Sequence, residues 1–371
     1  MNLQRAEPRV LYVRTEGQAA VPRPVLREQE AAGAAPRRVL VEEMLGFDLL
    51  GESDLAGLPG VRGALLRRLP VFIALGLEVA RRRRDYDVVV SWAEKYSVGI
   101  AAMLMLCWRR PRHVAIMDWI SKPIVRVPLR ILRRGIDRIL TWSSVQGEFA
   151  VTRIGFARDQ ITFIEHPVDQ EFFAPMRQEP AIIFSAGETQ RDFQTLIDAV
   201  SGLQTPTLIA ASRIGVFNGF RTYLTDAQEL SLPVGVTVKT MDPQELRRSY
   251  AQAKVVVVPL TPAENNAGIS VLLEAMSMGR PVVVTRTEGQ VDVVRDGENG
   301  LYVPPQDPIA LRDAIGRLLA QREFAETLGR TAREDVLEKH RVEAFAAAVR
   351  NAAHSAARRG SEVSVERIRE S

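Results

Sequence analysis

The feature that most limits the fold of this chain is a pair of short β-branched runs joined by one helical segment. Residues 255–259 read Val-Val-Val-Val-Pro, and residues 282–285 read Val-Val-Val-Thr. Runs of this kind are typical of strands that are buried on both faces of a parallel sheet. Apolar residues at helical spacing lie between them, and a glycine and a proline end that helix: Val271, Leu272, Ala275, Met278, Gly279 and Pro281. Strand, helix and strand together predict a parallel α/β fold.

The start of this helix has the chemistry of an anion-binding site. Backbone N–H groups in the first turn have no partner within the helix, and the positive end of the helix dipole lies there, so a diphosphate can bind. The residues that form this start are Asn266, Ala267, Gly268, Ile269 and Ser270. Glu274 follows about one turn later, where its carboxylate could accept two hydrogen bonds from a ribose diol. A solvated helix glutamate explains Glu274 equally well.

A second strand, loop and helix lies earlier in the chain. Residues 181–185 predict a strand, and the loop 187–192 reads Gly-Glu-Thr-Gln-Arg-Asp before an apolar helical stripe. Gly187 opens this loop. A guanidinium group can bind phosphate through two parallel hydrogen bonds, so Arg191 is a candidate to hold a diphosphate. A helix-capping or surface arginine is the alternative interpretation.

These two segments resemble the donor-binding signature of glycosyltransferase family 4, one of the glycosyl transferases group 1. In that family two glutamates lie eight positions apart, and here Asn266 stands at the first position and Glu274 at the second. The resemblance implies that Glu274 holds the ribose and that Asn266, an uncharged amide, orients the transferred sugar. Glu264 could replace the missing carboxylate if the loop is rearranged, although a surface carboxylate is the simpler interpretation.

The diphosphate clamp of the family also departs from its usual form. The family has an arginine and a lysine in the loop after the first strand of the donor domain. Arg191 falls on the lysine position, whereas Glu188 falls on the arginine position. Arg213, after the predicted strand 207–210, is a weaker candidate for the missing cation.

By this resemblance we expect a GT-B architecture, in which two Rossmann-like domains with parallel sheets face a cleft. The expected boundaries are residues 1–170 for an acceptor domain and 171–335 for a nucleotide-sugar donor domain. A helix at 336–354 is expected to pack back on the N-terminal domain, and the charged, serine-rich tail 355–371 is expected to be disordered. The implied activity is metal-independent, retaining sugar transfer without a cofactor, in which the leaving phosphate takes the acceptor proton.

The N-terminal half matches the family less closely. Strands are predicted at 10–13, 39–41, 88–91 and 113–118. Asp118 stands near the position of the usual cleft histidine, so it is expected to bind the donor sugar or the acceptor hydroxyl, unless it only caps a helix. Three further residues are candidates for the cleft because they follow predicted strands: Gly17, Glu94 and His166. His166 could bind phosphate, although a turn histidine with a local partner is as good an explanation.

Composition and cysteine content agree with a cytoplasmic α/β protein. A chain of 371 residues can bury two cores, and no stretch approaches the ~20 apolar residues that would cross a bilayer. No secretory signal is evident, and the single cysteine, Cys107, suits the reducing cytosol. With one cysteine and four histidines, a zinc site is not expected. Residues 85–87 read Asp-Tyr-Asp, but they stand at the start of a predicted strand, so we expect no metal there.

Positive charge is concentrated in one segment. Residues 62–138 contain 17 Lys and Arg against 6 Asp and Glu, although the whole chain carries only +4. Two apolar stretches in this segment, 69–80 and 124–138, are flanked or interrupted by arginine. Such helices can lie on an anionic membrane surface, so peripheral contact with the inner face of the membrane is one interpretation and solvated basic helices are the other. Nucleic acid is not an expected partner, because no motif interleaves these charges with stacking aromatic residues.

Two other functions remain compatible with the sequence. A non-catalytic glycosyltransferase-like binding subunit would explain why Asn266, Glu188 and Asp118 replace the usual groups. A nucleotide-sugar epimerase could share the architecture, but it would need carboxylates placed for elimination and addition. The nucleotide base, the sugar and the acceptor, whether glycan, lipid or small molecule, cannot be read from these residues.

Overall fold

The computed structural model describes residues 7–16, 21–211, 216–217, 220–221 and 232–369. The chain forms two compact units. Unit 1 comprises residues 1–25, 39–164 and 345–371, and unit 2 comprises residues 26–38 and 165–344. Helix α1 (Arg23–Ala31) lies across the boundary in sequence.

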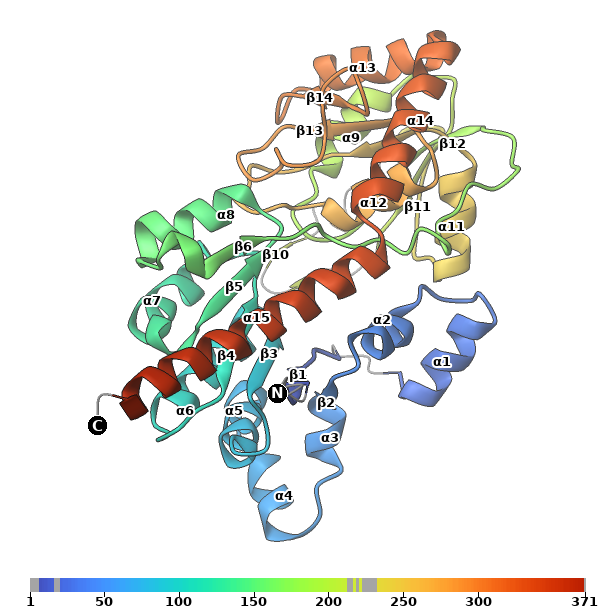
Figure 1. Ribbon diagram of the computed structural model, residues 1–371. Coiled ribbons are helices and arrows are strands. Elements are labelled where there is room, and N and C mark those ends of the chain that lie inside the picture. The colour runs from blue at the N-terminus through green and yellow to red at the C-terminus, as the bar shows by residue number, and fades with distance from the viewer. Residues whose placement is uncertain (1–6, 17–20, 212–215, 218–219, 222–231, 370–371) are drawn as a thin grey trace, which may run out of the picture. The chain divides into compact units, whose positions relative to one another are not determined.

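Unit 1 is built on a six-stranded sheet in which every pairing is parallel (Figure 1). The strand order is β2-β1-β3-β4-β5-β6. The strands are β1 (Val10–Val13), β2 (Asp48–Leu50), β3 (Val88–Trp92), β4 (Arg112–Ile116), β5 (Arg138–Thr141) and β6 (Ile161–Phe163). The order of the chain reverses between β1 and β3, which are neighbours, so their loops leave the same edge of the sheet at a topological switch point.

Helices cover both faces of this sheet. They are α2 (Arg38–Leu45), α3 (Glu52–Ala56), α4 (Gly60–Leu66), α5 (Val71–Arg82), α6 (Glu94–Met105), α7 (Pro123–Leu132), α8 (Ser144–Phe149) and α15 (Val342–Arg369), with 3₁₀ turns at Arg133–Gly135 and Arg158–Gln160 and a π-helical turn at Ala150–Ile154. Side chains alternate between the faces along each strand. Val88 and Val90 therefore pack against α15, whereas Val89 packs against α5 and α6.

Three details of unit 1 differ from the sequence-based expectation. Residues 39–41 were predicted as a strand, but they lie in α2. That prediction was wrong because three apolar residues are too few to show a period. The short edge strand β2 was not predicted. Helix α15 continues beyond residue 354, and Ala356 is still buried against the sheet.

Unit 2 contains a second parallel sheet of six strands, in the order β11-β8-β7-β12-β13-β14. The strands are β7 (Ile182–Ala186), β8 (Thr207–Ala210), β11 (Val236–Lys239), β12 (Ala253–Val258), β13 (Val282–Thr285) and β14 (Leu301–Val303), and a separate antiparallel pair is formed by β9 (Val216–Phe217) and β10 (Phe220–Arg221). Counted along the unit, the order is 3-2-1-4-5-6, which is that of a Rossmann sheet. Its switch point lies between β7 and β12.

The faces of this sheet are also covered by helices. They are α9 (Phe193–Val200), α11 (Pro243–Ala251), α12 (Ile269–Ser277), α13 (Pro308–Ala320) and α14 (Arg322–Lys339). Val255 and Val257 face α9 and α13, whereas Val256 and Val258 face α11 and α12. The uninterrupted Val255–Val258 run is thus explained by burial on both faces.

The predicted fold class is confirmed, since both units are parallel α/β sheets with helices on both faces. The predicted βαβ unit is β12, α12 and β13, with bounds within two residues of the expected ones.

Candidate functional site

The site in unit 2 lies where the chain order of the sheet reverses. Strands β7 and β12 are adjacent, and the loops that follow them leave the same edge. Two backbone hydrogen bonds join these loops, from Asp192 N to the Pro259 carbonyl (3.1 Å) and from Thr261 N to the Gln190 carbonyl (3.1 Å). Ligands of open α/β sheets bind at such a switch point. The two segments that the sequence singled out are therefore brought together.

Helix α12 begins at this edge with a glycine in the left-handed region. Gly268 has φ +81°, and a Cβ atom there would lie 2.7 Å from Cγ1 of Val258. Both facts require glycine. Ile269 N donates to the Asn266 carbonyl (3.2 Å), while the next N–H groups, of Ser270 and Val271, lie in the first turn, where no carbonyl of the helix can accept them. The helix start is therefore suited to an anionic oxygen.

The Arg191 guanidinium lies against this helix start. Its Nε donates to the Ala186 carbonyl (2.9 Å), and Nη1 donates to the Thr189 carbonyl (2.7 Å), so the group is held in one orientation. A Cβ atom on Gly187 would lie 2.8 Å from Cζ of Arg191, and one on Gly268 would lie 3.6 Å from Nη1. The guanidinium thus lies between Gly187 and Gly268.

Arg191 is buried, which is unusual for a charged side chain. Burial lowers its pKa to about 10, so the group is still cationic at neutral pH. Within the described residues, its side-chain hydrogen bonds go to backbone carbonyls and not to a carboxylate. A buried cation beside the positive end of a helix is stabilised by any anion that binds there. The preceding residue, Gln190, has φ +55°, a strained backbone of the kind found at ligand sites.

Glu274 lies one turn along α12 and interacts electrostatically with Arg191. Burial raises the pKa of its carboxyl to about 7, although Tyr250 and Arg191 act in the opposite direction. The Tyr250 hydroxyl donates to Oε2 of Glu274 (2.7 Å). The Glu274 side chain keeps partial exposure, so a ligand can still reach it. It is a half-buried, oriented carboxylate and not a freely solvated one.

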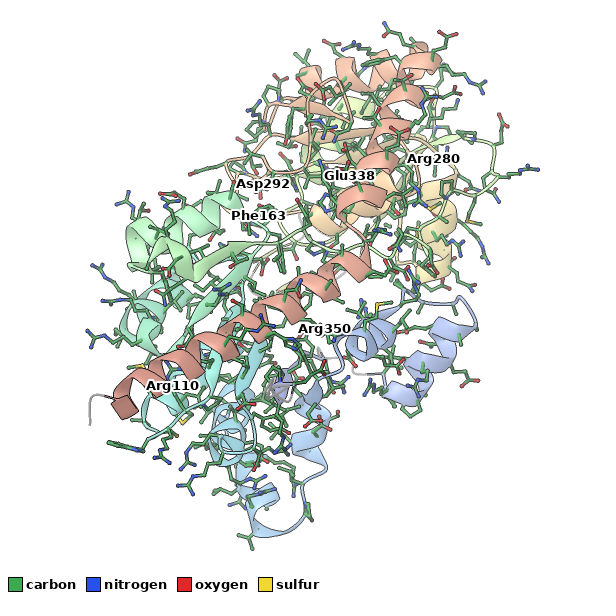
Figure 2. All side chains as sticks on the ribbon, viewed as in Figure 1. Arg110, Phe163, Arg280, Asp292, Glu338 and Arg350 are labelled. Carbon is green, nitrogen blue, oxygen red and sulfur yellow. The ribbon has the colours of Figure 1, made fainter. Side chains whose placement is uncertain are left out.

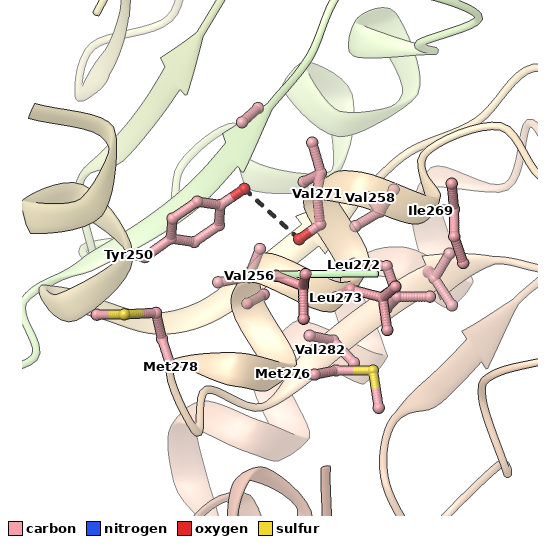
Figure 3. Close-up of a cluster of buried hydrophobic side chains, with 14 of the residues drawn as sticks. Tyr250, Val256, Val258, Ile269, Val271, Leu272, Leu273, Met276, Met278 and Val282 are labelled. Atoms are coloured by element: carbon pink, nitrogen blue, oxygen red, sulfur yellow. Dashed lines mark hydrogen bonds between the residues drawn. The ribbon is translucent and has the colours of Figure 1, made fainter. Parts of the chain in front are cut away.

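Tyr250 was missed by the sequence analysis. It is fully buried on α11, with Phe184 and Phe173 packed edge-on at 4.9 and 5.9 Å between ring centroids. Figure 3 shows its hydroxyl directed at α12, where it lies 3.5 Å from the Val271 carbonyl. Tyr250 precedes Glu274 by 24 residues, so only the tertiary fold shows that the two groups meet.

The loop before α12 is held from the side of β13. Gln290 Nε2 donates to the Ala267 carbonyl (2.9 Å), and a Cβ atom on Gly289 would lie 2.5 Å from Asn265 N. Asn266 is buried in this loop, whereas Glu264 is exposed. Glu264 is therefore a surface carboxylate in this structure, in line with the simpler of its two interpretations. Gln290 and Gly289 gave no recognisable signal in the sequence.

In unit 1, Glu94 and Asp118 lie together at the ends of β3 and β4. Glu94 Oε1 accepts hydrogen bonds from the backbone N–H groups of Asp118 (2.8 Å) and Trp119 (2.9 Å). Burial, the Glu94 charge and a hydrogen bond to Glu94 raise the pKa of the Asp118 carboxyl well above its ordinary value. The Asp118 carboxyl therefore stays neutral to a higher pH than an ordinary aspartate. Ala93, just before Glu94, has φ +84°, which is strained for a residue with a side chain.

The remaining candidates are placed as follows. Burial lowers the pKa of His166 to about 4, so His166 is neutral at pH 7 and brings no positive charge to a phosphate. Gly17 and Arg213 lie outside the described residues. Across the described ranges, no three His, Cys, Asp or Glu side chains are grouped so that they could hold a metal ion. Among these same residues, no helix has the length and apolar character needed to span a bilayer.

Comparison with known proteins places these features in a family. Residues 180–321 match the family model described as Glycosyl transferases group 1. The chain is 30% identical over 261 residues to the sulfoquinovosyl transferase SQD2 of Arabidopsis thaliana, and the alignment covers 67% of this chain. The chain spans about half of that relative, 49% of its length.

Two solved structures share the fold. The Anabaena protein HepE, in complex with UDP and glucose, has a TM-score of 0.69 at 15% identity, with 93% of this chain and 99% of HepE covered. Sucrose-phosphate synthase from Thermosynechococcus elongatus has a TM-score of 0.67 at 18% identity, with 98% and 100% covered. These likenesses establish a GT-B fold.

Proposed function

The chain belongs, through residues 180–321, to the glycosyl transferases group 1, and on this premise we propose that it transfers a sugar from a nucleotide-sugar donor to an acceptor hydroxyl. Unit 2 holds the donor, and unit 1 contributes to the acceptor side. The proposed reaction retains the anomeric configuration and needs no metal ion or other cofactor.

The observation that carries this proposal is the placement of Arg191 against the start of α12. The guanidinium and the N–H groups around Ser270 form one positive surface, built without an ion pair to a protein carboxylate in the described part of unit 2. A donor diphosphate fits this surface, and its negative charge grows as the sugar leaves. Fixed donors aimed at a developing charge are the usual main source of catalytic stabilisation.

Glu274 is the proposed ribose ligand. Its carboxylate lies about one turn from the diphosphate surface, and Tyr250 fixes its orientation through the 2.7 Å hydrogen bond. An ionised carboxylate accepts two hydroxyl hydrogen bonds, which matches a 2′,3′-diol. Asn266 is proposed to orient the sugar, because it precedes the helix start.

The remaining steps rest on the family resemblance and on unit 1. The leaving phosphate is proposed to take the acceptor proton on the same face of the sugar, so no protein base is needed. The Glu94 and Asp118 pair is proposed to bind a hydroxyl group of the sugar or the acceptor, since a carboxyl that is kept neutral can donate a hydrogen bond while carboxyl oxygens accept.

A UDP-linked sugar is the first donor to test, because HepE was solved with UDP and glucose. We further propose that the protein works in the cytoplasm, on the inner face of the membrane.

The proposal is tested by incubating the protein, in the presence of a chelator, with UDP-, GDP- and ADP-linked hexoses and measuring release of the nucleoside diphosphate. We expect one donor to be consumed, slowly with water and faster with an acceptor, and the product anomer to match the donor. Consumption that requires added Mg²⁺ or Mn²⁺ contradicts metal independence, and an inverted product contradicts retention.

The buried amide of Asn266 favours one second candidate, a subunit that binds donor without transferring the sugar. It predicts donor binding with no release of nucleoside diphosphate under any acceptor condition. Asn266→Glu separates the two: in a transferase that uses the amide to orient the sugar, it should lower the rate of nucleoside diphosphate release, whereas a subunit without transfer has no such rate to lose.

A further inference from the structure

Helix α7 of unit 1 exposes an apolar stripe that the folded unit does not cover. Ile124, Val127 and Ile131 are 76%, 60% and 70% exposed. They are spaced three and four residues apart, so they lie on one side of the helix. Val125 and Leu129 are buried and face the sheet. The helix therefore has a second apolar side that points to solvent.

A stripe of arginine adjoins this apolar stripe. Arg126, Arg130 and Arg134 are exposed and follow one another at intervals of four residues. At ~100° per residue, Arg126 and Arg130 lie on a side of α7 next to that of Ile124 and Ile131 and away from the core. Arg134 follows in the 3₁₀ turn Arg133–Gly135. None of the three guanidinium groups makes an ion pair within the described part of unit 1. By contrast, Arg81 and Arg82 are both paired with Glu78.

The end of α6 extends this surface. Leu106 and Trp108, just past the helix, are 80% and 86% exposed. The chain then returns to the end of α7, because Arg110, labelled in Figure 2, donates to the Arg134 carbonyl (2.9 Å) and to Asp137 (2.6 Å). Arg110, two residues after Trp108, is thereby bonded to the 3₁₀ turn that follows α7.

We propose that this surface, Leu106 and Trp108 with the exposed sides of α7, is where the protein lies on an anionic lipid bilayer. The apolar side chains enter the boundary between headgroups and acyl chains, and the three arginines contact lipid phosphates. This surface gives the proposed membrane contact a specific location. Only the role of the contact rests on the proposed function: it would hold the enzyme where a membrane-bound acceptor lies.

The chemistry favours a bilayer over other occupants. Residues 119–136 contain five Lys and Arg and no Asp or Glu. A second copy of the chain would present the same unpaired arginines, so like charges would meet across a two-fold interface. A nucleic acid would contact the arginines but would leave the isoleucines and Trp108 unused. An amphipathic helix with a basic side, an apolar side and a nearby tryptophan is typical of an interfacial helix.

The test is co-sedimentation of the full chain with vesicles of phosphatidylcholine alone or with about a third phosphatidylglycerol. We expect binding to the anionic vesicles at low salt and partial release as salt is raised, because charge contributes only part of the affinity. Each arginine is expected to contribute about a fivefold factor, so the triple variant R126Q/R130Q/R134Q should partition about a hundredfold more weakly. The variant I124S/V127S/I131S should lose about tenfold, most clearly at high salt.

Matched controls lie in unit 2. R317Q/R322Q/R330Q removes the same charge from α13 and α14, and Ile309→Ser removes an isoleucine that is 73% exposed. Both controls should bind vesicles like the unmodified chain. All variants change exposed side chains, and donor titration with each confirms that unit 2 is intact, so loss of lipid binding is distinguished from loss of the proposed function.

Three results would overturn the inference. The first is a chain that stays in the supernatant with anionic vesicles at low salt. The second is binding that depends on the arginines but not on Ile124, Val127 and Ile131, which would be nonspecific electrostatic attraction. The third is a lipid-free dimer that the isoleucine and valine substitutions dissociate, which would show that a second copy covers the surface.

Discussion

Substituting Glu274 with glutamine is expected to stabilise unit 2 at alkaline pH while weakening nucleotide binding. The carboxyl has an ordinary pKa of 4.5 in the unfolded chain and a pKa of about 7 in the folded chain, because burial disfavours its charge. Between these values the folded state binds more protons than the unfolded state. The free energy of unfolding therefore falls as pH rises from about 4.5 to about 7.

The size of this effect follows from the two pKa values. At 1.36 kcal/mol per pKa unit, the penalty is at most about 3 kcal/mol once the pH exceeds 7. It is an upper value because the side chain keeps some exposure. Glutamine can still accept the Tyr250 hydrogen bond but does not ionise. Relative to the unmodified chain, Glu274→Gln should therefore gain about 2 kcal/mol of stability between pH 5 and pH 8.

The assay must report on unit 2 alone, since two units need not unfold together. All four tryptophans lie in unit 1, at 92, 108, 119 and 142, so their fluorescence follows that unit. Hydrogen exchange of peptides from α12 reports on unit 2. Glu323→Gln, an exposed glutamate on α14, is the matched control and should show no pH-dependent gain.

The reasoning is refuted if Glu274→Gln and the unmodified chain differ by the same free energy at pH 5 and pH 8. It is also refuted if the stabilised variant binds nucleoside diphosphate as well as before. The combination of higher stability and weaker binding would show that the half-buried carboxylate is kept at a cost to the fold because the ligand needs it.

Three further substitutions test the same site. Tyr250→Phe removes the hydrogen bond that favours ionised Glu274. Nucleotide binding, which weakens on acidification, should then weaken at a higher pH and be about tenfold weaker at pH 7 by titration. An unchanged pH profile would show that Tyr250 does not tune Glu274. Arg191→Lys should weaken binding of nucleoside diphosphate about tenfold and leave the nucleoside alone unaffected; equal losses would exclude a phosphate contact. Gly268→Ala should destabilise unit 2 by about 1–3 kcal/mol, because φ is +81° and the new Cβ meets a strand side chain at 2.7 Å. The control Gly316→Ala in α13, where a Cβ has open space, should be neutral or stabilising. Equal effects of the two substitutions in urea unfolding would show that Gly268 is not required by the backbone.

The fold of unit 2 could be read from the sequence because each element carries its own local signal. The run Val255–Val258 is explained by burial on two faces, and Gly268 and Gly279 mark the ends of α12. Arg191 could be singled out from the sequence as a phosphate ligand. The sequence could not predict its burial, its two carbonyl contacts or its position against Gly268, since these depend on the adjacency of β7 and β12.

The contacts that tune the site were beyond sequence reasoning. Tyr250 bonds to Glu274, and Gln290 bonds to the Ala267 carbonyl; each bond joins residues more than twenty positions apart. Neither Tyr250 nor Gln290 stands in a recognisable motif. In unit 1, Asp118 and Glu94 were named separately, but only the register of β3 and β4 brings them together.

The most direct test of the account is a calorimetric titration of the purified chain, in the presence of a chelator, with UDP, GDP and ADP and with their parent nucleosides. We predict micromolar binding of one diphosphate, much weaker binding of its nucleoside, and loss of affinity in Glu274→Ala. Absence of binding to all three diphosphates, or affinity that is the same with and without Glu274, would contradict the assignment of this switch point as the nucleotide-sugar site.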